Sequence, residues 1–233
     1  MENHDEKNCE YLRFPNEVGE PDARNTLFVV QDPTTGQWRP ITINDQHEAI
    51  SKFKLIDHVP EEIVVQFETA KNLYLYAWHV YRFYPVSEHH ALACLEFALR
   101  KRFDPLPKKY LNKWGKASLK SLLTYAIEGG FIKNEGFRRW NEGAKNRATW
   151  RYREEKIREM EEKDLENIIL DESEIPIQDE DRKFDYINGL KEILPRIRNM
   201  YSHGTGSLHN QVLGTIEIVS EIINQIYSVQ SKT

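Results

Sequence analysis

Three side chains able to do chemistry gather in one short segment near the end of the chain, from Ile197 to Gly204. The segment supplies a cation in Arg198, an amide in Asn199 and an imidazole in His203. Asn199 and His203 stand four residues apart and therefore share one face of a helix, where the amide can hydrogen-bond the ring and hold one tautomer of it. If the protein is an enzyme, we expect its chemistry at this segment.

The spacing of Arg198 and His203 limits how these two side chains can cooperate. Because they are five residues apart, they point about 140° away from each other on a regular helix. They converge if Gly204 ends the helix in a left-handed conformation and frees His203, or if a second subunit completes the site. The simpler interpretation is a histidine that interacts favourably with the helix dipole and an arginine in a surface ion pair.

Apolar residues at helical spacing predict the scaffold that holds this segment. A first helix is expected to begin after Pro60 and to end before Pro85. Ser87 is expected to cap a second helix, and a third helix is expected from Ser118 to Glu128, ending at Gly129. The short connections between them make these helices antiparallel neighbours.

Two further helices flank the candidate segment. Apolar residues recur at helical spacing over residues 184–201, and Pro195 inside this pattern predicts a kink or a restart just before Arg198. Ser207 is expected to cap the last helix, which has a strong apolar stripe. Together with the three upstream helices, this pattern predicts an all-α protein, an antiparallel bundle of four or five helices.

Two segments lie outside the predicted bundle. Residues 26–30 and 37–43 read as strands around a turn, so residues 1–60 are expected to form an N-terminal extension with a small β-hairpin. Residues 61–229 form the helical domain. Between about residues 134 and 185 the chain is rich in charge and poor in apolar residues, which predicts a charged helical insertion with a loop.

Charge is distributed unevenly along the chain. Residues 100–153 contain fifteen lysine or arginine residues against four acidic ones, whereas residues 154–185 contain five against fourteen. The basic block predicts a surface for a polyanion, although solvated helix faces would give the same pattern.

Aromatic side chains interleave with the basic block, as in proteins that hold single-stranded RNA between cations and stacking rings. The rings are Tyr110, Trp114, Phe137, Trp140, Trp150 and Tyr152. Their alternative role is that of buried helix anchors. The residues to which we assign RNA binding are Lys108, Lys109, Lys113, Arg138, Arg139 and Trp140.

The segment from Arg198 to Gly204, between the last two helices of a predicted bundle, resembles the R-x4–6-H motif of the HEPN superfamily. The resemblance includes the polar Asn199 after the arginine and the small Gly204 after the histidine. Residues 91–100 and 122–132 also look like helices of that family. The likeness covers roughly residues 61–135 and 184–229 and leaves out the hairpin and the charged insertion.

This resemblance implies a metal-independent endoribonuclease that acts as a homodimer, with the Arg198–His203 regions of two subunits meeting at the interface. Arg198 would stabilise the extra negative charge on the scissile phosphate. His203 would act as a general acid or base during attack by the 2′-hydroxyl or departure of the 5′-oxygen, and Asn199 would orient the site. The products would be 2′,3′-cyclic phosphate and 5′-hydroxyl ends.

Within that family the chain looks like a toxin or a phage-defence effector, which implies a protein antitoxin or regulator as a partner. One feature departs from the pattern: Thr205 stands where HEPN toxins paired with minimal nucleotidyltransferases carry a tyrosine that is modified. This departure argues against that partner. The alternative function is a catalytically inactive HEPN-like module that binds RNA, a nucleotide or a protein. A helical scaffold that binds no ligand is the third interpretation.

Glu96 and Arg100 stand four residues apart on the second predicted helix, where they form a surface ion pair or support the site from behind.

Several function classes lack support in the sequence. Cys9 and Cys94 have no metal-ligand partner at useful spacing, and no cluster of carboxylates or cysteines lies near His79, His89 or His90. We therefore expect no metal and no cofactor. No apolar run is long enough for a membrane helix, and the acidic N-terminus lacks the apolar core of a signal peptide. These features predict a cytoplasmic protein in a reducing compartment.

Overall fold

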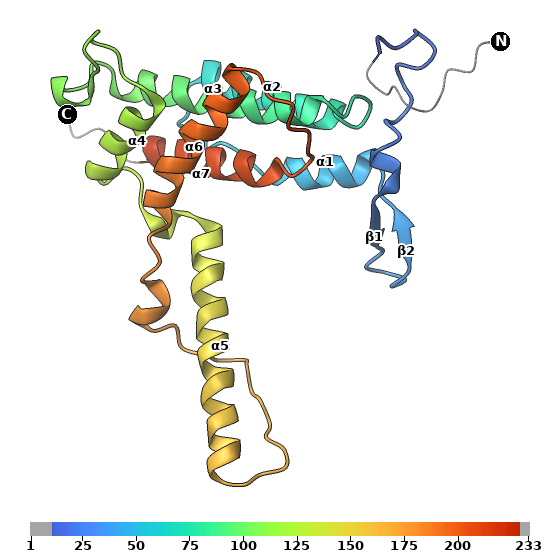
Figure 1. Ribbon diagram of the computed structural model, residues 1–233, viewed down its shortest axis with the longest axis vertical. Helices are drawn as coiled ribbons and strands as arrows, with labels where there is room; N and C mark the ends of the chain where they lie inside the picture. The colour runs from blue at the N-terminus through green and yellow to red at the C-terminus, as the bar shows by residue number, and fades with distance from the viewer. Residues whose placement is uncertain (1–10, 229–233) are drawn as a thin grey trace.

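The computed structural model describes residues 11–228, so that Cys9 lies outside the described residues. Within this range the chain is mostly helical, with seven α-helices and one two-stranded antiparallel sheet (Figure 1). The helices gather in one body, from which the hairpin and a long helical stalk project. The prediction of a mainly α-helical protein is confirmed.

Helix α3 (Phe83–Phe103) is the centre of the body and contacts α2 (Glu61–Tyr76), α4 (Leu119–Glu128), α6 (Tyr186–Ser202) and α7 (Leu213–Ser228). These five helices correspond to the five predicted from the sequence. Each of them turns its apolar stripe towards the others, because burying that stripe is what stabilises a bundle. The largest fully buried side chains include Phe67, Leu92, Leu95, Leu122, Leu194 and Ile222.

The connection between α2 and α3 differs from the prediction. Pro85 lies in the first turn of α3 and does not separate the two helices, since proline lacks an N–H group that the first turn leaves unbonded anyway. Ser87 is not a cap: it is buried inside α3, and its hydroxyl donates to the Ala70 carbonyl on α2.

The later helix boundaries follow the sequence in part. Helix α4 begins beside Ser118, as predicted, and the Ser118 side chain caps it by accepting from the Ser121 amide. Helix α6 is continuous through Pro195, so the predicted restart before Arg198 is wrong. Helix α7 begins at Leu213 and not after Ser207, because residues 203–212 form a loop.

The N-terminal extension contains the predicted hairpin, β1 (Val29–Gln31) paired with β2 (Trp38–Pro40), and a helix that the sequence analysis missed. This helix, α1 (Ile43–Ser51), packs against α2. Its start carries a capping box, in which the Thr42 side chain and the Asp45 side chain each bond the other residue's backbone amide. The Thr-x-x-Asp spacing was the signal for this helix.

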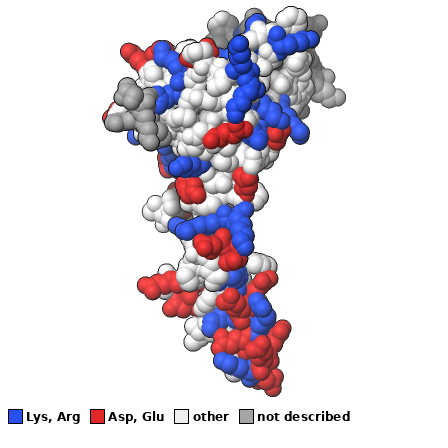
Figure 2. All heavy atoms as spheres, turned by 90° about the vertical axis from the view of Figure 1, so that its left-hand side faces the viewer, with Lys and Arg blue, Asp and Glu red and all other residues white. Residues whose placement is uncertain are grey.

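The charged insertion forms a stalk that consists of α5 (Arg138–Glu162) and a return segment lying beside it (Figure 1). The prediction of a helix in this charged region is therefore confirmed, although Trp140, Ala144 and Ala148 in its first half are buried. The return segment is pinned to α5 where the Arg151 guanidinium lies 3.1 Å from the Asp181 carboxylate. Acidic side chains predominate towards the end of the stalk, whereas the body shows clusters of lysine and arginine (Figure 2).

Buried Glu217 on α7 holds the root of the stalk. Its two carboxylate oxygens lie 2.5 Å from Arg138 Nε and 3.0 Å from Arg139 Nε.

Among residues 11–228, no helix combines the length and the hydrophobicity of a membrane span.

Candidate functional site

Helix α6 presents Arg198 towards α3. Leu190 and Leu194 are buried on the inner side of α6, and Arg198 follows Leu194 by four residues, so its stem starts from the same side of the helix. The Arg198 side chain is 36% exposed. It therefore sits at the edge of the α3–α6 contact, with its charged end reachable from solvent.

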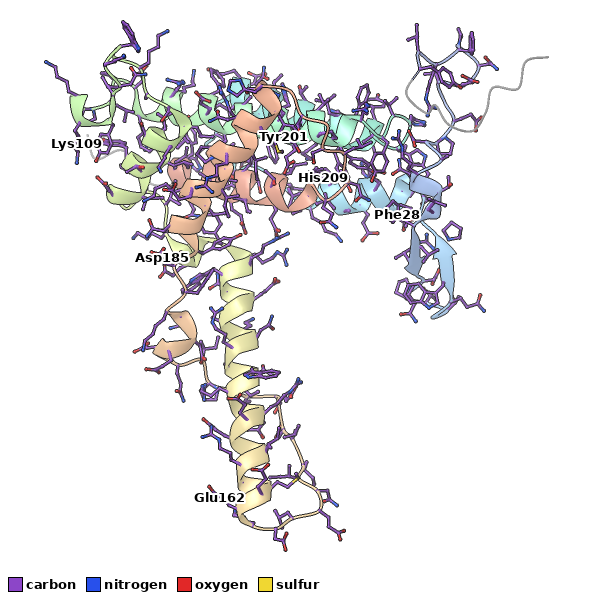
Figure 3. The ribbon with its side chains drawn as sticks, viewed as in Figure 1. Phe28, Lys109, Glu162, Asp185, Tyr201 and His209 are labelled. Atoms are coloured by element: carbon purple, nitrogen blue, oxygen red, sulfur yellow. The ribbon has the colours of Figure 1, made fainter. Side chains whose placement is uncertain are left out.

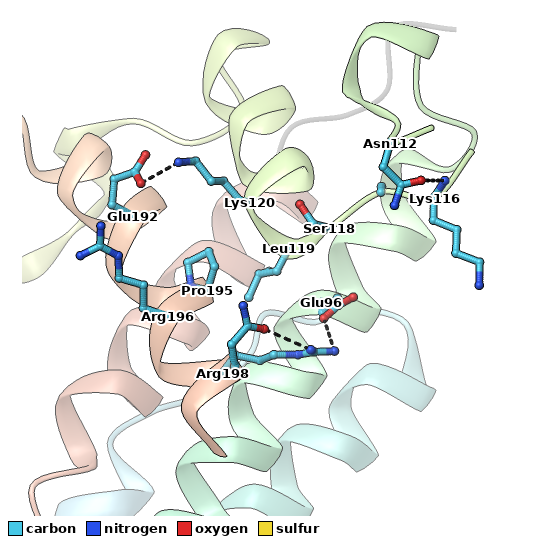
Figure 4. Close-up of a pocket in the computed structure, with 12 residues that line it drawn as sticks. Glu96, Asn112, Lys116, Ser118, Leu119, Lys120, Glu192, Pro195, Arg196 and Arg198 are labelled. Carbon is cyan, nitrogen blue, oxygen red and sulfur yellow. Dashed lines mark hydrogen bonds and ion pairs between the residues drawn. The ribbon is translucent and has the colours of Figure 1, made fainter. Parts of the chain in front are cut away.

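Glu96 on α3 fixes the position of the Arg198 guanidinium. One Glu96 carboxylate oxygen lies 3.1 Å from Arg198 Nη2 (Figure 4). The other oxygen lies 2.6 Å from Arg100 Nη2. Arg100 also donates to the Ala117 carbonyl at 2.6 Å. The structure thus brings Glu96 and Arg100 to Arg198, with Glu96 bridging the two cations.

Arg198 lines a groove of about 620 Å³ between α6, α3 and the start of α4. Four cationic side chains line it, contributed by Lys116, Lys120, Arg196 and Arg198. Lys120 pairs with Glu192 across the groove at 2.6 Å. Figure 4 shows how the groove walls come from α6 on one side and from residues 112–120 on the other. The remaining lining residues are Glu96, Asn112, Ala117, Ser118, Leu119, Glu192, Pro195 and Asn199.

His203 lies one turn beyond Asn199 and is exposed to solvent. It is the C-terminal cap of α6, with its backbone amide bonded to the Asn199 carbonyl at 3.1 Å. Gly204 has φ +79°, so the predicted left-handed end of the helix is confirmed. The predicted hydrogen bond from the Asn199 amide to the His203 ring is not formed; instead the Asn199 oxygen accepts from Arg198 Nη1 at 3.3 Å.

The histidine that faces the Arg198 side of α6 within one chain is His89. Its Nε2 lies 3.3 Å from the Ser202 hydroxyl, and Ser202 is four residues after Arg198. Burial, with the nearby charges of Arg198 and His90, lowers the pKa of His89 below its ordinary value, which favours the neutral ring. The sequence alone predicts no role for His89 beside Arg198. The usable signal was its seven-residue distance from Glu96, which places both on one face of α3.

A buried carboxylate beside His89 holds the end of α6 in place. Glu88 accepts hydrogen bonds from the hydroxyl groups of Tyr201, at 2.5 Å, and Thr215. His209 joins this group, with Nε2 at 3.3 Å from the Tyr201 hydroxyl and 3.8 Å from Glu88. Burial, together with the bond to Glu88, raises the pKa of Tyr201. Figure 3 marks Tyr201 at the end of α6 and His209 on the loop that leads to α7.

The three predicted RNA-binding lysines are close in sequence to residues 112–120, which line the groove. Lys108 and Lys109 form the short 3₁₀ helix η2 (Lys108–Tyr110), and Lys109 lies at the far end of the body (Figure 3). Lys109 pairs with Glu128 at 3.4 Å. Lys113 belongs to the turn that forms one wall of the groove.

The other three predicted RNA-binding residues serve the fold. Trp140 is 4% exposed, and its indole N–H donates to the Phe184 carbonyl, so its ring cannot stack on a base. Arg138 and Arg139 are both committed to buried Glu217 at the root of the stalk. The interpretation of Trp140 as a stacking ring is therefore wrong, and it is a buried anchor.

Within residues 11–228, no group of three or more histidine, cysteine, aspartate or glutamate side chains is arranged to hold a metal ion. No protein-family model, no curated protein and no solved structure matches the chain.

Proposed function

We propose that this protein is a HEPN-type endoribonuclease that cleaves RNA without a metal ion, with Arg198 and His203 as its catalytic residues. The observation that carries the proposal is the groove, because it gathers three further cationic side chains around Arg198. A phosphodiester backbone is the ligand that such a concentration of positive charge favours.

In the proposed reaction the 2′-hydroxyl of the RNA attacks the adjacent phosphorus, and the bond to the 5′-oxygen breaks. Arg198 lies at the groove and stabilises the charge that develops on the phosphate oxygens. His203 moves the proton, either from the 2′-hydroxyl or to the leaving 5′-oxygen. The two products carry a 2′,3′-cyclic phosphate and a 5′-hydroxyl.

The geometry supports a site completed by a second copy of the chain. Arg198 is directed towards α3 by Glu96, whereas His203 is exposed at the end of α6. A homodimer through the Arg198–His203 region would bring the His203 of each subunit to the groove of the other. In a cell such an enzyme would act as a toxin or a phage-defence effector, restrained by an antitoxin or regulator.

A specific observation favours a second candidate, an inactive module that binds RNA. The Arg198 guanidinium is already paired with Glu96 at 3.1 Å and bonded to Asn199. An arginine engaged in this way can still contact a phosphate, but it has fewer free N–H groups for the extra charge of a transition state.

RNA cleavage in the presence of EDTA tests the proposal. Wild type should release fragments with cyclic phosphate ends, and both Arg198→Ala and His203→Ala should lose activity by about 100-fold or more. Arg158→Ala on the stalk and His58→Ala on the surface are the matched controls and should cleave like wild type. No cleavage by wild type across varied RNAs leaves only the binding module, and unchanged cleavage by both site variants removes the site assignment.

Glu96→Gln distinguishes the two candidates further. In either candidate this substitution removes one negative charge from the groove, so RNA binding should tighten. In an enzyme it also frees Arg198 and loosens its position, so the cleavage rate should change as well. Measurement of the mass in solution tests the dimer: a monomer at micromolar concentration in a cleaving protein would exclude the composite site.

A further inference from the structure

The turn of residues 112–116 is a rigid structure on the wall of the groove. The Asn112 side chain accepts from the backbone amides of Trp114 and Lys116 at 2.9 and 3.0 Å. Backbone bonds join Asn112 to Lys116 and Gly115 to Asn112, and Gly115 takes the left-handed conformation that closes the turn. The side chains that this turn presents are therefore held in a defined place before any ligand arrives.

Trp114 stands out on this turn. Its side chain is 73% exposed, whereas Trp140, another ring of the basic block, is buried. The Lys113 ammonium lies 5.0 Å from the centre of the Trp114 ring, so a cation accompanies the exposed aromatic face. Within residues 11–228, neither Lys113 nor Lys116 forms an ion pair, which leaves both charges available to an anion.

The turn connects Trp114 to the groove of Arg198. Asn112 and Lys116, each two residues from Trp114, both line that groove. An extended polyanion lying in the groove therefore passes beside the turn that carries the ring. Lys116 and Arg196 can contact its phosphates on opposite walls, while the Trp114 ring can contact a base between two phosphates.

We propose that Trp114 is a stacking site for an unpaired base, so that the protein selects single-stranded RNA and positions it with a phosphate at Arg198. An exposed ring on a rigid turn loses little freedom when a base stacks on it. Bases within a duplex are already stacked on each other and do not reach such a ring. The site rests on the proposed function for its place beside a scissile phosphate, but the stacking itself requires only binding.

Binding measured without cleavage tests this site. The parent protein is the His203→Ala chain, and the probe is a short fluorescein-labelled, adenosine-rich RNA followed by anisotropy. Trp114→Ala should weaken binding of the single strand by about 5- to 150-fold, and Trp114→Phe should restore much of it, because stacking on an aromatic ring does not depend on hydrogen bonds. Binding of a duplex of equal length should change little.

Trp150→Ala is the matched control, because Trp150 is also exposed but lies on the stalk. It should bind the single strand as the parent does. The proposal is overturned if Trp114→Ala binds like the control, if it loses duplex and single strand equally, or if the parent binds no RNA, in which case the exposed ring serves a protein partner. A chain that binds through Trp114 and never cleaves retains this site and loses only the enzymatic proposal.

Discussion

The hydrogen bond between Tyr201 and Glu88 should be among the strongest single contacts that hold the candidate site. The perturbation is a pair of substitutions, Tyr201→Phe and Glu88→Gln, made separately and together. Tyr201→Phe removes the hydroxyl and keeps the ring, and Glu88→Gln keeps the shape of the side chain and replaces one acceptor oxygen with an amide. Neither leaves a large cavity, so the hydrogen bonds dominate the effect.

The magnitude follows from burial and geometry. The Glu88 side chain is 4% exposed, and the Tyr201 hydroxyl lies 2.5 Å from its carboxylate. A hydrogen bond to a charged group contributes about 1.5–3 kcal/mol, and the burial of Glu88 limits the solvent screening that would reduce it. Tyr201→Phe should lower the free energy of unfolding by that amount. Glu88→Gln should lower it by at least as much, because the Thr215 hydroxyl depends on the same carboxylate.

Urea denaturation followed by circular dichroism gives the free energy of unfolding for all four proteins. The double variant should be less destabilised than the sum of the single ones, with a coupling energy of about 0.5–3 kcal/mol. Additive effects within about 0.5 kcal/mol would show that the two residues do not share a contact and would refute this description of the end of α6.

Three further expectations concern stability. Burial lowers the pKa of His89 below 6.5, so the unfolded chain takes up that proton first as the pH falls; His89→Gln should make the loss of stability from about pH 7 to about pH 5 shallower, and His58→Gln should not. Trp140→Ala should cost about 3–5 kcal/mol of unfolding free energy in urea, and exposed Trp150→Ala less than about 0.5 kcal/mol. Burial raises the pKa of Glu221 above 4.5, so the folded chain holds this proton more tightly than the unfolded chain does. The stability that results is lost as the pH rises through the raised pKa. Glu221→Gln should therefore flatten the change in thermal midpoint between about pH 4 and about pH 7.

Local sequence signals predicted the helices where the signal and the structure depend on the same few residues. The start of α4 beside Ser118 and the left-handed Gly204 are of this kind, since each involves only neighbours in the chain. The same reasoning assigned the wrong role to Ser87. A serine hydroxyl can form its hydrogen bond either as a helix cap or with a carbonyl of a neighbouring helix, and the packing of α2 on α3 determines which bond forms.

The surroundings of the candidate site were less predictable, because they join distant parts of the chain. Arg198 and His203 were found from a local motif, but Ser202 and His89 are 113 residues apart. The sequence does not indicate which lysine of the basic block lacks an ion pair and which arginine pairs with a buried carboxylate. That distinction separated Lys113 from Arg138 and required the position of Glu217.

The root of the stalk has a consequence for how the chain tolerates change. The ring of Phe137, just before α5, lies 5.2 Å from the ring of Tyr186, at the start of α6. The insertion therefore leaves the body and returns to it at one point, like a loop tied off at its base. Growth or shortening of the stalk beyond Trp140 and before Phe184 should leave the path of α6 unchanged, because the contacts of the root lie outside that part. The outer stalk can therefore diverge in length and charge while the groove keeps its shape.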